Sequence, residues 1–376
     1  MTTERFDVVV VGGGPAGAAA AIAARRGGVR VLLLDRAEFP RDKPCGDGIA
    51  ADAVDVLAEL GVRDVTAGYP PIGRLRLIAP GGAAVARALP RPAYTVPRRV
   101  FDARLVRAAV AGGAELRRHT VREIGQDGPE VVVDGRYRAR VLIGADGAGS
   151  VVRRALGEPV NPPGHLAIAI RGYRPTANTT EQVIVTTGRR WPAYAWEFPL
   201  GDGAANVGYG EVLRGAPLSR AYLLERLGDL LPGTEPDGLR GHHLPLSTRR
   251  PAPGRGRTLL AGDALSLINP FTGEGIFYAV LSGALAGAAA AAGPDRVAER
   301  YRDALRRRLG RHLRHSGFVA RLTRQPRVVD AAVRAAARDA AVFHRMVDLG
   351  LGDGVFDART IGRILGELPR RVPAAP

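Results

Sequence analysis

The first 35 residues contain the pattern that most restricts the fold of this chain. An apolar run at 6–11, FDVVVV, enters the glycine turn GGGPAG at 12–17, an alanine-rich segment at 18–28 and a second apolar run at 29–35. Such runs are typical of strands buried on both faces of a parallel sheet. The order strand, glycine turn, helix, strand therefore predicts a βαβ unit that binds a dinucleotide.

The glycines and the terminal acid of this unit each have a physical role. Gly12 permits the tight turn, Gly14 lets the backbone approach a pyrophosphate, and Gly17 lets the helix pack closely on the strand. The helix N-terminus offers unpaired amides to the phosphates, and Asp35 accepts hydrogen bonds from ribose hydroxyls. A glycine turn without a nucleotide is the alternative, and the complete order of elements argues against it.

Two later segments repeat the passage from a buried strand to a glycine turn with an acid. VLIGADGAGSVVRRALG at 141–157 carries Asp146, and 257–287 carries Asp263 followed by Gly273 and Gly275 at the start of a long helix. A nicotinamide site alone does not need these two further turns. The apolar part of that helix, 275–293, is rich in alanine and glycine, which favours a buried helix over a membrane span.

The segments between these turns have a different pattern. Residues 182–188 and 204–210 alternate apolar and polar positions, as in an antiparallel sheet with one ligand-facing side. The sequence thus predicts an α/β protein with a Rossmann-like, parallel-sheet cofactor domain, an interleaved antiparallel-sheet substrate domain and C-terminal helices. The predicted ranges are 1–66, 96–160 and 251–295 for the cofactor domain, 67–95 and 161–250 for the substrate domain, and 296–376 for the helices.

The formal charge of +17 raises the question of an anionic partner. The arginines are dispersed, aromatics make up only 5%, and no zinc or RNA-binding motif is present, so nucleic acid is not expected. The basic helix at 296–322 either lies on anionic lipid or is a solvated face packed on the core. With a single cysteine and no signal peptide, we expect a cytoplasmic protein that can associate peripherally with a membrane, as a monomer or weak dimer, with no metal site.

Together the three glycine turns resemble the fingerprints of the FAD enzymes with the p-hydroxybenzoate hydroxylase type of fold. The resemblance implies that Asp263 contacts the ribityl chain and that the helix after Gly275 directs its amino end at the flavin. YTVPRRVFDARLVRAA at 94–109 matches the family's arginine pattern and makes Arg98 a flavin or pyrophosphate contact, with a surface arginine as the alternative. The further cofactor contacts that the resemblance implies are Ala16, Arg36, Cys45, Gly46, Gly48, Val121, Asp146, Gly147, Gly273 and Ile276.

Two motifs within this fold resemble the geranylgeranyl reductase branch, whose members saturate isoprenoid double bonds. FPRDKPCGDGI at 39–49 is similar to the branch's cysteine signature, and YAWEFPLGDGAANVGYG at 194–210 is similar to its Y-x-W-x-F-P segment. The last fingerprint lacks the histidine of the aromatic hydroxylases and has Glu274 between its glycines. A halogenase needs a separate active-site lysine, and the only lysine here, Lys43, lies inside the cysteine motif.

The residues of these motifs have functional and structural interpretations. Cys45 is the candidate catalytic residue beside the flavin, or else a small buried hydrophobe. Asp47 either has a role there or caps the turn, and Lys43 is placed at the rim, near a phosphate. The alternating aromatics project from one strand face into a substrate pocket or form a core stripe; they are Tyr194, Trp196 and Phe198.

The resemblance implies an FAD-dependent reductase that transfers hydride from reduced flavin to a double bond of an isoprenoid or similar apolar alkene. The electron donor is open between NAD(P)H and another reductant, since the sequence has no second complete dinucleotide unit for a nicotinamide. The alternative enzyme is an FAD-dependent monooxygenase acting on a small aromatic or polyketide-like metabolite, which shares the FAD fingerprints. A third hypothesis, a flavin-binding or membrane-associated interaction protein without enzymatic activity, is supported only by the positive charge of the chain. A tyrosine, Cys45 and an ordered water are all open as the proton donor.

Overall fold

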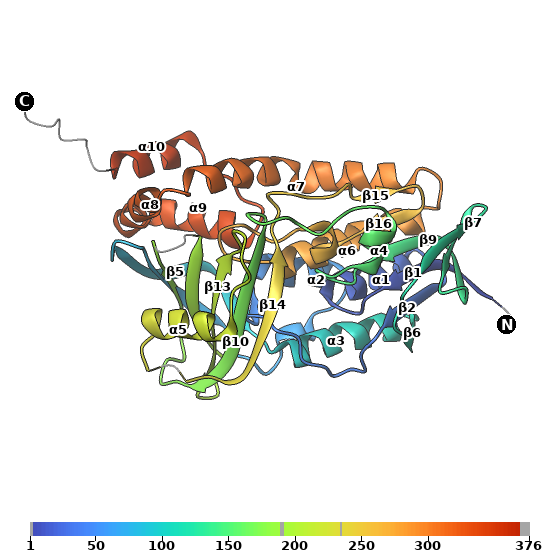
Figure 1. Cartoon of the computed structure of the whole chain (residues 1–376), viewed down its shortest axis with the longest axis horizontal. Coiled ribbons are helices and arrows are strands. Elements are labelled where there is room, and N and C mark those ends of the chain that lie inside the picture. Colours follow the sequence, from blue (N-terminus) through green and yellow to red (C-terminus); the bar gives the residue numbers. More distant parts are fainter. Residues whose placement is uncertain (1–2, 189–191, 234, 369–376) are drawn as a thin grey trace, which may run out of the picture.

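The computed structural model describes residues 3–188, 192–233 and 235–368, and the tail at 369–376 of the predicted helical region lies outside them. Two sheets lie at opposite ends of the molecule, and helices pack around both (Figure 1). The α-helices are α1 Pro15–Arg26, α2 Ala51–Glu59, α3 Arg98–Ala111, α4 Val151–Ala155, α5 Arg220–Leu230, α6 Ile276–Ala291, α7 Val297–Leu322, α8 Pro326–Arg338, α9 Ala340–Leu351 and α10 Ala358–Gly366. Two 3-10 turns occur at Asp64–Thr66 and Gly262–Leu265.

The first sheet has the order β15-β16-β9-β1-β2-β6, with β8 pairing β9 and β7 pairing β8. Its strands are β1 Glu4–Val11, β2 Val31–Asp35, β6 Glu115–Arg118, β7 Ile124–Asp127, β8 Glu130–Val133, β9 Tyr137–Gly144, β15 Gly254–Arg255 and β16 Thr258–Leu260. The five strands from β16 to β6 run parallel. Every residue of β2 is buried, as the continuous apolar runs predict.

Small residues let the helices beside this sheet approach one another closely. A Cβ at Gly283 of α6 would lie 2.1 Å from the backbone oxygen of Ala16 in α1. A Cβ at Gly287 would lie 2.2 Å from the Ala20 oxygen one turn further on. The alanine- and glycine-rich α6 is therefore a buried packing element, as the sequence predicts, and no helix among the described residues is long and apolar enough to cross a membrane.

The second sheet has the order β14-β10-β13-β12-β11-β4-β5-β3 and is antiparallel apart from the β11–β4 pair. Its strands are β3 Gly48–Ile49, β4 Ile72–Ile78, β5 Ala84–Thr95, β10 Leu166–Pro175, β11 Glu181–Thr186, β12 Ala193–Pro199, β13 Ala204–Val212 and β14 Asp237–Pro245. Leu223 and Leu227 of α5 form a core with Tyr209 of β13. Helices α8 and α9 form another core with β4 and β5.

The architecture confirms the predicted fold class of a parallel-sheet α/β unit, an interleaved antiparallel sheet and C-terminal helices. The two sheets are linked at the cysteine motif, because β3 pairs with β5 of the second sheet although it follows β2 of the first. The domain boundaries given above stay a prediction. What matters for the site is that the second sheet and helices α7 to α9 face the same space as the start of α1.

Candidate active site

The N-terminus of α1 forms a cradle for an anion. Gly12 has φ 102°, a left-handed conformation, and a Cβ at Gly17 would lie 1.7 Å from the Gly12 oxygen. A Cβ at Gly14 would meet only the ends of Arg41 and Arg98, at 3.8 and 3.9 Å. No side chain caps this helix, so its first amides are available to a phosphate. This cradle fits the pyrophosphate of FAD.

A cavity of about 320 Å³ extends from this cradle to the second sheet and the C-terminal helices. It contains most of the residues expected at the site: Gly14, Ala16, Cys45, Gly46, Gly48, Arg98, Gly147, Asp263, Gly273, Gly275 and Ile276, with Tyr194, Trp196 and Phe198. Other predicted cofactor contacts are not in its walls: Gly12, Gly17, Asp35, Arg36, Val121 and Asp146. Gly12 and Gly17 shape the turn instead, whereas Arg36 is exposed and Val121 is buried.

Two predicted acids are engaged with backbone amides. Asp35 accepts hydrogen bonds from the N–H groups of Gly13, at 2.6 Å, and Ala37, at 2.8 Å. Asp146 accepts from the Ser150 hydroxyl and the Val151 amide, at 2.5 and 2.6 Å, and so fixes the start of α4. Both acids therefore hold the turns that border the cavity.

Arg98 is buried and held in a fixed orientation. Its Nε and Nη2 donate to Oδ1 and Oδ2 of Asp102 at 2.6 and 2.8 Å, and Arg41 Nη1 lies 2.9 Å from the same carboxylate. Burial opposes the charged form, but Asp102 outweighs it and raises the pKa of Arg98. The surface alternative for Arg98 is wrong, and Arg41 is a second cation that the sequence reasoning missed.

Asp263 is the centre of a second group of charged residues in the cavity wall. Its Oδ2 lies 3.6 Å from Lys43 Nζ and 3.9 Å from His242 Nε2. Burial opposes ionisation of Asp263, yet Lys43 and His242 hold its pKa well below the usual range. The only lysine of the chain therefore lies beside the acid predicted to meet the ribityl chain.

The Cys-Gly-Asp turn is fixed by a buried hydrogen-bond network. Asp47 is fully buried with φ 59° and accepts from Tyr173 Oη at 2.5 Å and Asn206 Nδ2 at 2.8 Å. Asn206 Nδ2 also donates to the Cys45 carbonyl at 2.9 Å. Burial raises the pKa of Asp47 to about 6 against these hydrogen bonds. Asp47 thus does more than cap its turn. In the sequence, only the N-V-G motif at 206–208, which begins with Asn206, indicated that this residue belongs to the site.

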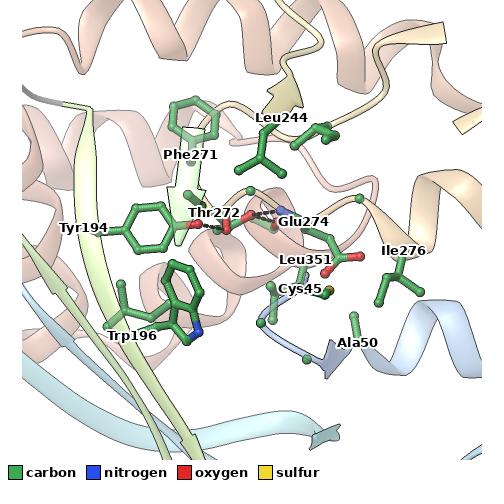
Figure 2. A pocket seen from close by; sticks show the side chains of 18 of the residues that line it. Cys45, Ala50, Tyr194, Trp196, Leu244, Phe271, Thr272, Glu274, Ile276 and Leu351 are labelled. Carbon is green, nitrogen blue, oxygen red and sulfur yellow. Dashed lines mark hydrogen bonds between the residues drawn. The ribbon is translucent and has the colours of Figure 1, made fainter. Parts of the chain in front are cut away.

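The three aromatics of β12 form one wall, as their alternation predicts. The ring centroids of Tyr194 and Trp196 are 5.9 Å apart, and those of Trp196 and Phe198 are 6.5 Å apart. Trp196 Nε1 donates to Asn206 Oδ1 at 2.9 Å, and Tyr194 Oη donates to the Thr272 carbonyl. Figure 2 shows Tyr194 and Trp196 projecting from the same strand toward the space next to Cys45 and Glu274.

Two groups in this space can hold a proton. Burial raises the pKa of the Cys45 thiol, so the neutral thiol is favoured. Burial also raises the pKa of Glu274 to about 7, although its carboxylate accepts from the Phe277 amide at 2.7 Å at the start of α6. The Glu274 side chain lies between Cys45 and Ile276 (Figure 2). The sequence singled out Glu274 only as an acid between glycines and gave it no role.

Known proteins resemble this chain in sequence and in fold. Residues 5–182 match the model of an FAD binding domain. A menaquinone reductase of Mycobacterium tuberculosis is 32% identical over 313 residues, which cover 74% of this chain and 75% of that protein. Digeranylgeranylglycerophospholipid reductase 1 of Methanopyrus kandleri is 37% identical over 309 residues, covering 75% and 79%. The crystal structure of a geranylgeranyl bacteriochlorophyll reductase-like protein from Thermoplasma acidophilum aligns over 99% of this chain and 98% of that one, with a TM-score of 0.80 at 20% identity.

Proposed function

Because this chain belongs to the geranylgeranyl reductase family of FAD-dependent oxidoreductases, we propose that it saturates carbon-carbon double bonds of an isoprenoid or a similar apolar alkene. When bound, FAD supplies the reducing equivalents for this reaction. The observation that carries the proposal is the division of one cavity into a charged end and an apolar end.

The charged end fits the cofactor. Apart from Cys45 and Tyr194, the ionisable residues of the cavity wall are Lys43, Arg98, Arg171, His242, Asp263 and Glu274. We assign the amides of Gly14 and Ala16 to the pyrophosphate, and Gly147, Asp263 and Ile276 to the flavin side. These assignments follow from the uncapped start of α1 and from the position of each residue in the cavity wall.

The apolar end fits a hydrocarbon chain. It lies between β4, β11 and helices α7 to α9, and its wall consists of aliphatic residues, one methionine, one phenylalanine and two threonines: Leu75, Leu77, Ile78, Ile184, Thr186, Val319, Thr323, Val329, Ala332, Val333, Met346, Val347 and Phe356. None of these wall residues is charged. A chain without polar groups gains free energy from burial here, whereas a polar metabolite would leave its own groups unpaired.

The residues at the junction of the two ends would align the alkene and handle the proton. We place the double bond beside Cys45, facing the wall of Tyr194 and Trp196. The Tyr194 hydroxyl proton is engaged with the Thr272 carbonyl, and burial raises the pKa of Tyr194 well above its usual range. Of the candidate proton donors, Cys45 therefore stays in place and Tyr194 does not, and the Glu274 carboxyl joins Cys45 as a group that can hold a proton for the second carbon.

The remaining expectations are part of the same proposal. NAD(P)H or another donor reduces the flavin, and a substrate with a long apolar chain brings the protein to the membrane surface as a monomer or weak dimer. Among the described residues no cluster of ligands for a metal ion occurs, and the proposed reaction does not require a metal ion.

Mass spectrometry of the product tests the proposed function. The FAD-loaded protein is reduced with dithionite without oxygen and incubated with geranylgeranyl diphosphate, a menaquinone and an unsaturated archaeal-type glycerophospholipid in separate reactions. After any quinol has been returned to the quinone with a chemical oxidant, a gain of two hydrogens per reduced double bond is expected for at least one substrate. A gain of one oxygen atom when air is admitted, with no hydrogenated product, would instead establish the monooxygenase.

A further inference from the structure

We propose that the C-terminal half of α7 and its junction with α8 dock on an anionic lipid bilayer, next to the place where the apolar end of the cavity approaches the surface. We call the exposed set Arg311, Arg314, Phe318, Arg321, Leu322, Arg324 and Arg327 the α7 patch. The role of this patch in delivering substrate rests on the proposed function, but its binding to lipid can be measured without turnover.

The α7 patch exposes two large apolar side chains. Phe318 is 55% exposed and Leu322 is 47% exposed, although most large hydrophobic residues of the described chain are buried. Positions four apart lie on the same face of a helix, so these two side chains are neighbours. Arg314 is four residues before Phe318, and Arg321 is three residues after it, so both flank the apolar pair.

Positive charge dominates this region, although Asp330 and Glu367 line a surface pocket together with Arg327. Residues 304–329 contain eight arginines and no aspartate or glutamate. Arg306 and Arg308 pair with Asp303 and Asp353, but within the described ranges no ion pair joins the arginines of the α7 patch to an acid. Apolar side chains surrounded by uncompensated arginines match the chemistry of an anionic bilayer surface, which offers phosphates above and hydrocarbon below.

The patch is continuous with the apolar end of the cavity. Val319 and Thr323 follow Phe318 and Leu322 by one residue and line the cavity, together with Val329 of α8. One residue corresponds to a rotation of about 100° around a helix. The same helix end thus presents Phe318 and Leu322 outward and Val319 and Thr323 to the cavity, so the patch lies directly beside the apolar part of the cavity wall.

A second copy of the chain is a poorer occupant than a bilayer. A stable protein interface buries roughly 800 Å² on each partner around an apolar centre depleted in charge. Two apolar side chains among five arginines do not supply such a centre, and a like-charged copy would be repelled. The geometry therefore points to lipid.

The test is co-sedimentation of the FAD-loaded protein with vesicles of phosphatidylcholine alone or with added phosphatidylglycerol. Phe318→Asp combined with Leu322→Asp should weaken binding to the anionic vesicles at least about tenfold. Arg314→Gln and Arg321→Gln should each weaken it about fivefold at low salt. The matched control is Val110→Asp, because Val110 is 44% exposed on α3, at the edge of the molecule opposite α7 (Figure 1); it should bind as the wild type does.

Each outcome decides the proposal. The expected losses in the α7 variants, with the control unchanged, support it. Three binding results would overturn it: equal binding of the wild type to both vesicle types, wild-type binding by the α7 variants, or the same loss of binding in Val110→Asp. Light scattering would also overturn it if it showed a dimer that the Phe318 and Leu322 changes dissociate. Turnover of detergent-dispersed substrate should stay at the wild-type level in these variants. If the wild type shows no turnover but binds vesicles as expected, the proposed reaction fails and the docking surface stands.

Discussion

Asn206→Leu should loosen the Cys-Gly-Asp turn, although the Asn206 side chain is not itself part of the cavity wall. Asn206 is fully buried and makes three hydrogen bonds, to the Cys45 carbonyl at 2.9 Å, to the Asp47 carboxylate at 2.8 Å and from the Trp196 indole at 2.9 Å. Leucine has a similar volume but cannot make any of these bonds.

The magnitude follows from the groups left unpaired. A buried polar group without a partner costs about 1–3 kcal/mol. Three such groups would cost roughly 3–9 kcal/mol, and we expect the lower part of that range, about 3–5 kcal/mol, because Asp47 keeps its bonds from Tyr173 and the Arg98 amide. Tyr173→Phe removes a single bond to Asp47 and should cost about 1–2 kcal/mol.

Urea unfolding of the FAD-free protein measures these losses, and alkylation of Cys45 reports the turn itself. Cys45 is the only cysteine, so the iodoacetamide rate has one source. We expect faster alkylation in Asn206→Leu and a smaller increase in Tyr173→Phe. A loss below about 1 kcal/mol in Asn206→Leu, together with an unchanged alkylation rate, would refute the reasoning.

Three further changes test other parts of the site. Glu274 has a folded pKa of about 7, above its unfolded value, so its contribution to stability is complete below about pH 4.5 and is lost as the pH rises through 7. Glu274→Gln should remove this pH dependence, which amounts to a decrease of up to about 3 kcal/mol in the free energy of unfolding between the two pH values, as measured by urea unfolding. Ala332→Trp should block the apolar end and raise KM for long prenyl chains at least tenfold more than for short ones, while Ala337→Trp, on the exposed face of α8, should leave both KM values unchanged. Gly283→Ala places a methyl group 2.1 Å from the Ala16 oxygen and should lower stability by at least about 2 kcal/mol in thermal unfolding, whereas an unchanged Tm would contradict the close packing of α1 and α6.

The sequence predicts the cofactor half well because its requirements are local. Gly12, Gly14 and Gly17 are fixed by one turn and one helix start, and the apolar runs identify the parallel strands. The aromatic wall could also be predicted, since Tyr194, Trp196 and Phe198 alternate along a single strand. In each case the sequence pattern that supports the prediction spans only a few residues.

The supports of the cysteine turn depend on contacts between distant residues. Asn206 reaches Cys45 across 161 positions, and Tyr173 reaches Asp47 across 126. No periodicity in the chain indicates such contacts. Glu274 was visible as an acid between glycines, but its raised pKa results from burial that only the folded chain creates.

The role of the C-terminal helices was likewise hidden. Their amphipathic pattern separates a buried face from an exposed face but does not say which buried positions are core and which line a cavity. Met346 and Val347 of α9 contribute to the cavity wall because α8 and α9 fold back over β4 and β5. The packing of these helices on the sheet joins segments that are about 250 residues apart in the sequence. One example is the hydrogen bond that Arg87 Nε donates to the Ala336 carbonyl.

The rate of flavin reoxidation without oxygen tests the central claim most directly. The reduced, FAD-loaded protein is mixed in a stopped-flow instrument with an excess of a prenylated substrate that has no quinone head group, because a quinone would itself oxidise the flavin. The fully saturated analogue of this substrate is the control. The account predicts that oxidised flavin absorbance returns with the unsaturated substrate and not with the analogue, and that blocking the apolar end with Ala332→Trp slows the return. Flavin that stays reduced with every unsaturated substrate until oxygen is admitted would contradict the account.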